Sequence, residues 1–124
     1  MDVLLVEDDE LVREALGEDL CCAGLSVVAA PTAEDALRAA GDGAEPPPAV
    51  LVTDVDLGPG MDGLTLAEQA RRRWPELGVV VMTGDSGNLE QRPEPDSRER
   101  RLLKPFMPDR LVAEVHGLLG RPGG

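Results

Sequence analysis

The feature that most constrains the fold is a regular alternation of short apolar runs with amphipathic helical patterns. Apolar runs of strand length occur at residues 2–6, 25–30, 49–54, 78–83 and 102–106. Helical stripes occupy residues 12–23, 33–40, 64–74 and 108–120. Strands that alternate with helices form a parallel sheet through right-handed crossovers, and helices cover both of its faces. The pattern therefore predicts an α/β fold with a doubly wound five-stranded parallel sheet.

Residues 84–101 interrupt this alternation. Their position between the fourth and fifth predicted strands calls for a fourth helix, but Pro93 and Pro95 lie in the middle of the segment. Proline lacks a backbone N–H, and its ring clashes with the preceding helical turn. We therefore expect the fourth helix to be irregular.

Length and charge narrow the class of protein. The 124 residues suffice for one domain with one buried core, so we expect a single domain across residues 1–124. A net charge of −12 repels phosphate backbones and anionic lipids, which argues against direct binding to nucleic acid or membranes. No apolar run approaches the length of a membrane span and the first residues carry no secretory signal, so the expected location is cytoplasmic. The adjacent Cys21 and Cys22 form neither a disulfide framework nor a zinc-binding spacing, and we expect them to be reduced.

Polar side chains collect where the predicted strands end. The first strand is followed by Glu7 and Asp8, and the third ends on Asp54. The fourth ends on Thr83, and the fifth supplies Lys104. In a doubly wound sheet the functional crevice lies outside the carboxyl ends of the strands. We therefore expect these side chains to meet at one edge of the sheet.

The chemistry of this set indicates a divalent metal and a phosphoryl group. Clustered carboxylates raise one another's pKa and cost stability unless a cation neutralises them. Oxygen ligands without histidine or cysteine select a hard cation, and a few carboxylates with waters suit Mg²⁺. An aspartate is also able to attack phosphorus and form an aspartyl phosphate. Thr83 would then hydrogen-bond a phosphoryl oxygen, and Lys104 would offset its charge.

The motifs together resemble the receiver domain of two-component response regulators, over essentially the whole chain. The resemblance rests on four motifs, which are VLLVEDD, LVTDVDL with its following MDG, VVVMTG, and KPF. Their order and rough spacing match the family together, which is far more specific than any one motif. The resemblance implies a flavodoxin-like fold with strand order 2-1-3-4-5.

The resemblance also implies a function as a phosphoacceptor switch. Asp54 matches the phosphoacceptor, and Thr83 and Lys104 match the hydroxyl and the ammonium that hold the phosphoryl group. The implied phosphodonor is a sensor histidine kinase or a phosphotransfer protein, and the downstream protein target is unknown. Such a domain catalyses only its own phosphorylation and dephosphorylation, so we do not expect an enzyme in the ordinary sense.

A magnesium site follows from the same resemblance. Glu7 and Asp8 match the acidic pair that binds Mg²⁺ together with Asp54. The backbone carbonyl of Asp56 matches the third protein contact of the metal. The implied cofactor is therefore Mg²⁺, held at the same edge of the sheet as the phosphoacceptor.

Two other functions fit parts of the sequence. The spacing of Asp54 and Asp56 is also that of phosphatases of the haloacid dehalogenase type, but their motif is expected at the first strand. That alternative leaves the acidic residues after the first strand unexplained. A pseudo-receiver, which uses the fold for interaction without phosphorylation, is the third possibility. The complete set of matched site residues argues against it.

Three positions outside this set carry separate expectations. Arg101 stands where the family commonly has an aromatic residue, and we expect it to stay outside because a buried guanidinium needs a charge partner. We expect the output to use residues 84–101 instead. Asp85 is expected to affect the rate of dephosphorylation, and His116 to be a surface or packing residue.

Overall fold

The computed structural model describes residues 1–40, 47–84, 87 and 97–120. Along the chain the elements are β1 (Val3–Val6), α1 (Glu10–Cys22), β2 (Val27–Ala30), α2 (Ala33–Ala40), β3 (Val50–Asp54), α3 (Gly63–Arg73), β4 (Gly78–Thr83), β5 (Glu99–Leu103) and α5 (Pro108–Leu119). No helix among these described residues is long and apolar enough to cross a membrane.

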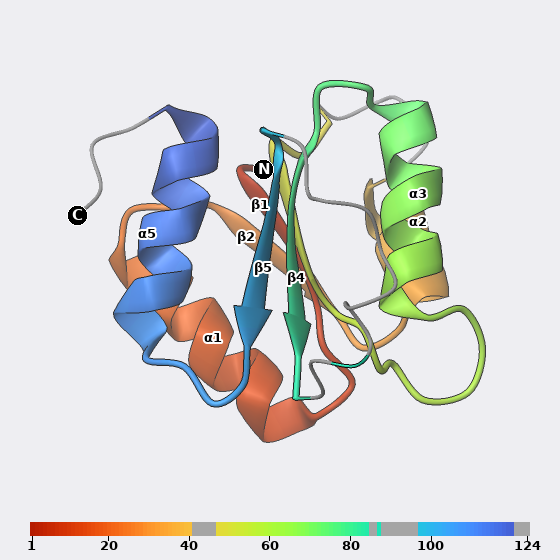
Figure 1. The fold of residues 1–124 in the computed structure, drawn as a ribbon, viewed down its shortest axis with the longest axis horizontal. Helices are drawn as coiled ribbons and strands as arrows, with labels where there is room; N and C mark the ends of the chain where they lie inside the picture. The colour runs from red at the N-terminus through yellow and green to blue at the C-terminus, as the bar shows by residue number, and fades with distance from the viewer. Residues whose placement is uncertain (41–46, 85–86, 88–96, 121–124) are drawn as a thin grey trace.

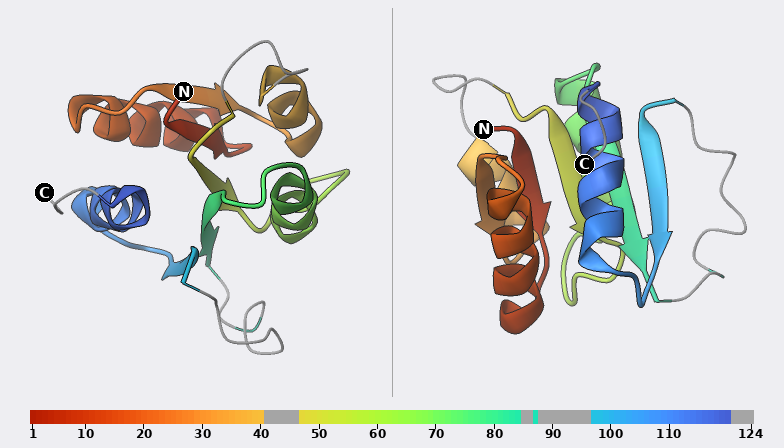
Figure 2. Two further views of the ribbon diagram at one scale, coloured as in Figure 1. Left: turned by 90° about the horizontal axis from the view of Figure 1, so that it is seen from above. Right: turned by 90° about the vertical axis from the view of Figure 1, so that its left-hand side faces the viewer.

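The strands form one parallel sheet in the order β2-β1-β3-β4-β5. Helices α1 and α5 cover one face, and α2 and α3 cover the other (Figures 1 and 2). The central strands are buried on both faces because each face is covered by a helical layer and its own apolar cluster. The predicted doubly wound α/β fold and its strand order are therefore confirmed.

Local sequence signals explain where the helices begin and end. Asp9 caps α1 by accepting hydrogen bonds from two backbone N–H groups, and Gly24 follows the helix with a φ of 86°. Thr32 accepts a hydrogen bond from the backbone N–H of Asp35 at 3.0 Å at the start of α2. Asp62 does the same for Thr65 at the start of α3, at 2.8 Å. These caps orient the loops that carry the polar residues at the sheet edge.

The fifth strand corrects the sequence prediction. The apolar run at 102–106 predicts the strand there, but β5 spans Glu99–Leu103. It pairs in parallel with β4, and the backbone N–H of Val79 donates to the carbonyl oxygen of Arg98 at 2.8 Å. The strand includes charged residues because β5 is an edge strand and these side chains have ion-pair partners. Arg101 pairs with Glu99 within the strand, and Arg100 approaches Glu114 of α5. Lys104 consequently lies just beyond the strand end.

The segment predicted as an irregular fourth helix lies mostly outside the described residues. Asp85, Pro93 and Pro95 are among those outside, so the expectations for them remain predictions. At the end of the segment, Arg101 belongs to β5, and its side chain is only 17% exposed. The expectation that Arg101 stays outside is wrong, because its Nε donates to Glu99 Oε2 at 2.7 Å and so gains the required charge partner. His116 is buried in α5, which agrees with a packing role.

Candidate functional site

The end of β1 places two acids at the carboxyl edge of the sheet. Glu7 is only 1% exposed, although glutamate is an ionisable residue. The neighbouring Asp8 is exposed to solvent. The backbone N–H of Asp9 donates to Glu7 Oε1 at 3.2 Å. Asp9 itself serves as the helix cap, which leaves Glu7 and Asp8 as the acidic pair that the sequence indicated.

Asp54 ends β3 and is 7% exposed. Close packing of α3 fixes its backbone, because a Cβ on Gly63 would clash with the carbonyl oxygen of Asp54. The backbone N–H of Gly63 donates to the carbonyl oxygen of Val55 at 2.9 Å. The glycine of the MDG motif therefore lets α3 begin directly against the strand end that carries Asp54.

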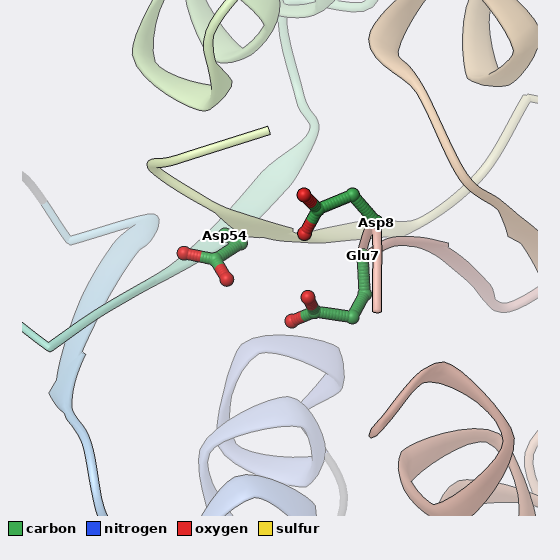
Figure 3. Close-up of side chains that lie close together, drawn as sticks. All are labelled: Glu7, Asp8 and Asp54. Atoms are coloured by element: carbon green, nitrogen blue, oxygen red, sulfur yellow. The ribbon is translucent and has the colours of Figure 1, made fainter. Parts of the chain in front are cut away.

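The three acids gather at one place. Ligand oxygens of Glu7, Asp8 and Asp54 all lie within 4.8 Å of one another. Figure 3 shows that the three carboxylates are grouped together where β1 and β3 end. Oxygen donors at this spacing, with no histidine or cysteine among them, fit a hard divalent cation such as Mg²⁺.

Lys104 supplies positive charge to the same place. Its Nζ lies 2.6 Å from Asp54 Oδ2 and 3.4 Å from Glu7 Oε2. Together with Asp8, these side chains combine three carboxylates with one ammonium, so the acids remain in excess. The cluster therefore retains a need for cationic charge that a divalent ion would meet.

The electrostatics of Glu7 and Lys104 differ. Burial, reinforced by the nearby charge of Asp54, raises the pKa of Glu7 to about 7. Burial also disfavours the ammonium of Lys104, but its contacts with Asp54 and Glu7 outweigh that effect and raise the pKa of Lys104 above its usual value. The lysine is therefore charged at neutral pH, whereas Glu7 is close to its titration point.

Thr83 and Asp56 complete the set predicted from the sequence. Thr83 is buried at the end of β4, and its carbonyl oxygen accepts a hydrogen bond from the backbone N–H of Lys104 at 2.7 Å. Asp56 is exposed, and its backbone N–H donates to Asp54 Oδ1 at 3.3 Å. Both residues thus lie next to a member of the charged cluster, at the same edge of the sheet.

One residue of the site was missed by sequence reasoning. Arg13 in the first turns of α1 donates from Nη1 to the carbonyl oxygen of Glu7 at 2.9 Å. A cation near a helix N-terminus opposes the helix dipole, so its presence there is a signal that another contact favours it. The bond ties α1 to the end of β1 and so helps to fix the acidic pair.

Comparison with known proteins identifies the family. The family model of the response regulator receiver domain matches residues 3–116. The chain belongs to the response regulator receiver domain family. Such domains are the signalling switches of response regulators.

Relatives of known sequence agree with this family. The chain is 38% identical over 125 residues to the response regulator protein FleR of Pseudomonas aeruginosa, covering 98% of this chain and 25% of FleR. It is 34% identical over 122 residues to the response regulator MprA of Mycobacterium leprae, covering 98% of this chain and 52% of MprA. The chain therefore spans about a quarter of one relative and about half of the other.

Solved structures show the same fold. A response regulator receiver protein from Sinorhizobium medicae superposes with a TM-score of 0.85 at 26% identity, covering 97% of this chain and 94% of that one. The receiver domain of NtrX from Brucella abortus gives a TM-score of 0.80 at 31% identity, with 98% and 100% covered. The receiver domain of DrrB, in a structure described as BeF3-activated, gives 0.79 at 27% identity, with 97% of each chain covered.

Proposed function

We propose that this receiver domain is the phosphoacceptor switch of a two-component system and that Asp54 accepts the phosphoryl group. The observation that carries the proposal is the contact of Asp54 with both kinds of charge. Its carboxylate lies within a group of three acids suited to Mg²⁺, and it also contacts the ammonium of Lys104 at 2.6 Å. Phosphoryl transfer requires this combination of a nucleophile, a metal and a fixed cation.

Each residue has a distinct part in the proposed reaction. A carboxylate oxygen of Asp54 forms the new bond to phosphorus while the bond from phosphorus to the donor's leaving atom breaks. Lys104 and the hydroxyl of Thr83 hold phosphoryl oxygens. Glu7, Asp8 and Asp54, with the backbone carbonyl of Asp56, would hold Mg²⁺. The bound ion would neutralise charge on the carboxylates and the phosphoryl oxygens.

The surface beside the site supports a protein as phosphodonor. Side chains of Val12, Leu16 and Phe106 line a groove of about 240 Å³ that also includes Lys104. Next to it in sequence, Leu11 is 78% exposed and Met107 is 70% exposed. Exposed apolar side chains around a reactive carboxylate suit docking of another protein. We propose that a sensor histidine kinase or phosphotransfer protein docks at this groove. The phosphorylated domain would then act on a separate protein target. Both steps would take place in the cytoplasm.

Labelling from a small phosphodonor tests the proposal. With Mg²⁺ and acetyl phosphate, the chain should gain one acid-labile phosphoryl group, and Asp54→Asn should abolish the gain. Asp62→Asn is the matched control, because Asp62 is an exposed acid of the same loop that caps α3. Labelling that persists in Asp54→Asn, or that needs no metal, would contradict the proposal.

The fold argues against the phosphatase alternative. Asp54 ends the third strand of a receiver domain, not the first strand, where the phosphatase motif is expected. We therefore propose that the domain phosphorylates itself stoichiometrically and does not turn over external phosphomonoesters. Sustained hydrolysis of p-nitrophenyl phosphate that is lost in Asp54→Asn would favour the phosphatase. A chain that takes up no phosphoryl group from any donor would be a pseudo-receiver.

A further inference from the structure

A second concave feature lies at the opposite, amino-terminal edge of the sheet. It is an open pocket of about 490 Å³ between the residues that lead into β3, the turn from α3 to β4, the start of β5 and the end of α5. In Figure 1 this is the upper edge, away from the arrowheads of the strands. From Ala49 to Asp54 along β3 the distance is roughly 16 Å at the usual rise per strand residue. The pocket is therefore separate from the phosphoacceptor site.

Backbone hydrogen bonds fix the frame of this pocket. The N–H of Leu77 donates to the carbonyl oxygen of Trp74 at 3.0 Å, which closes a turn around Pro75. The N–H of Gly78 donates to the carbonyl oxygen of Ala49, also at 3.0 Å. A Cβ on Gly78 would lie only 3.2 Å from Leu118, so the glycine allows α5 to pack closely there. The pocket is formed before any ligand arrives, which lowers the cost of binding.

The walls of the pocket are apolar and stiff. Pro47, Pro48, Pro75 and Trp74 all line the pocket, and Leu118 contributes from α5. Proline rings have little conformational freedom to lose, and an indole offers a broad flat surface. Such walls suit a planar ring better than a flexible chain.

Among the residues that the structure describes, the charged side chains lining the pocket are two arginines and one glutamate, although the whole chain carries a net charge of −12. These residues are Arg73, Arg98 and Glu76. Arg98 Nη1 donates to the carbonyl oxygen of Glu76 at 2.7 Å, which holds the guanidinium at the pocket. The guanidinium of Arg73 lies 5.1 Å from the ring centroid of Trp74. Two arginines beside an aromatic wall therefore favour a ligand that combines a ring with an anionic group.

We propose that this pocket binds a small planar organic anion, with its ring against Trp74 and the prolines and its carboxylate, sulfonate or phosphate on Arg73 and Arg98. Such a ligand would give the domain a chemical input separate from phosphorylation. The proposal does not depend on the chemistry at Asp54.

The chain provides its own reporter for a binding test. Trp74 is the only tryptophan, and the chain has no tyrosine, so intrinsic fluorescence arises at this pocket. Titration with 1-anilinonaphthalene-8-sulfonate should quench Trp74 saturably, with energy transfer to one bound probe. The neutral analogue N-phenyl-1-naphthylamine should bind about tenfold more weakly, because it lacks the charge-assisted contact with the arginines.

Substitutions distinguish binding of the probe at this pocket from unspecific binding to other apolar surface. Arg73→Gln combined with Arg98→Gln should weaken binding of the anionic probe about tenfold or more. Arg110→Gln is the matched control, because Arg110 is an exposed arginine in the first turn of α5, at the other end of that helix. Arg110→Gln should leave binding of the anionic probe unchanged. Asp54→Asn should also leave it unchanged, whether or not Asp54 is the phosphoacceptor.

Three results would overturn the proposal. They are equal affinity for the anionic and neutral probes, probe binding that leaves Trp74 fluorescence unchanged, and equal affinity in the double variant and the Arg110 control. The comparison of the two probes uses the unmodified chain, so it remains decisive if the double variant fails to fold.

Discussion

An ion pair within β5 and a charged cluster just beyond that strand are both partly buried, and they differ in the balance of their charges. Glu99 and Arg101 lie two residues apart on one strand, their charges match one to one, and their side chains are 9% and 17% exposed. Lys104 lies just past the strand and contacts Asp54 and Glu7 from two other strand ends. The pair joins one cation to one anion, whereas the cluster around Lys104 has three carboxylates and one ammonium. Imbalance, and not burial, distinguishes the reactive cluster from the structural one.

The balanced pair should show its importance through stability. Arg101→Met leaves the buried Glu99 without this partner, and breaking a partly buried pair of this kind costs up to about 3 kcal/mol. The free energy of unfolding from urea titrations should fall by that amount. The double variant Glu99→Leu/Arg101→Met should recover most of the loss, because apolar residues often replace a buried pair without cost. A double variant as unstable as the single one would show that Arg101 acts through other contacts.

The unbalanced cluster should show its importance through chemistry. Lys104→Met removes the cation that faces Asp54, and loss of one such electrostatic contact slows a reaction about 100-fold. The measurement is the rate of phosphorylation by acetyl phosphate at saturating Mg²⁺. Under conditions where it remains folded, the double variant Glu99→Leu/Arg101→Met should react close to the parent rate. Equal slowing in both variants would remove the distinction between the two clusters.

Glu7 should make the stability of the metal-free protein depend on pH. Its pKa rises from 4.5 to about 7 on folding, so the folded chain binds the proton more tightly than the unfolded chain. The free energy of unfolding should therefore fall as pH increases from about 4.5 to 7 and then level off. Glu7→Gln should remove this slope and be more stable than the parent at pH 8, by about 3 kcal/mol.

Magnesium provides the control for that experiment. The ion would neutralise the carboxylates, so adding it should stabilise the parent at pH 8 and narrow its difference from Glu7→Gln. The parent should also bind Mg²⁺ more weakly below pH 7, because protons then compete for Glu7. Thermal melts of both proteins across pH, with and without Mg²⁺, supply the measurement. Parallel pH profiles would show that Glu7 does not titrate in this way.

A third pair near β5 should matter least. Arg100 lies on the opposite face of the strand from Arg101 and approaches Glu114 of α5 at 3.7 Å, with both side chains partly exposed. Partly exposed pairs contribute little because water already solvates both charges. Arg100→Gln should change the free energy of unfolding by less than about 0.5 kcal/mol in the same urea titrations. A loss comparable to that in Arg101→Met would contradict the ranking by burial.

The sequence predicted the interior of the sheet better than its edge. The run GVVVMT gave β4 its observed limits, because a strand covered on both faces must be apolar throughout. At the edge, the same rule placed β5 too late, since Glu99 and Arg101 neutralise each other within the strand. The hydrophobic pattern does not reveal a contact between charged side chains two residues apart, so it could not predict that the strand begins at Glu99.

In the candidate site, too, some features were predictable from the sequence and others were not. The positions of Glu7, Asp8 and Asp54 at neighbouring strand ends followed from the order of the elements and from the motifs. The contact of Arg13 with the carbonyl oxygen of Glu7 did not, because it depends on where a long side chain turns after the helix has packed. Strand order places residues at an edge, while the three-dimensional packing decides which of them touch.

Chemical trapping of the modified residue tests the central claim most directly. After reaction with acetyl phosphate and Mg²⁺, sodium borohydride reduces an aspartyl phosphate to homoserine, which mass spectrometry of peptides assigns to one position in the unmodified chain. Our account predicts homoserine at position 54 alone, and only when Mg²⁺ was present. Homoserine at the position of Asp8 or Asp56, or at position 54 without any metal requirement, would contradict it.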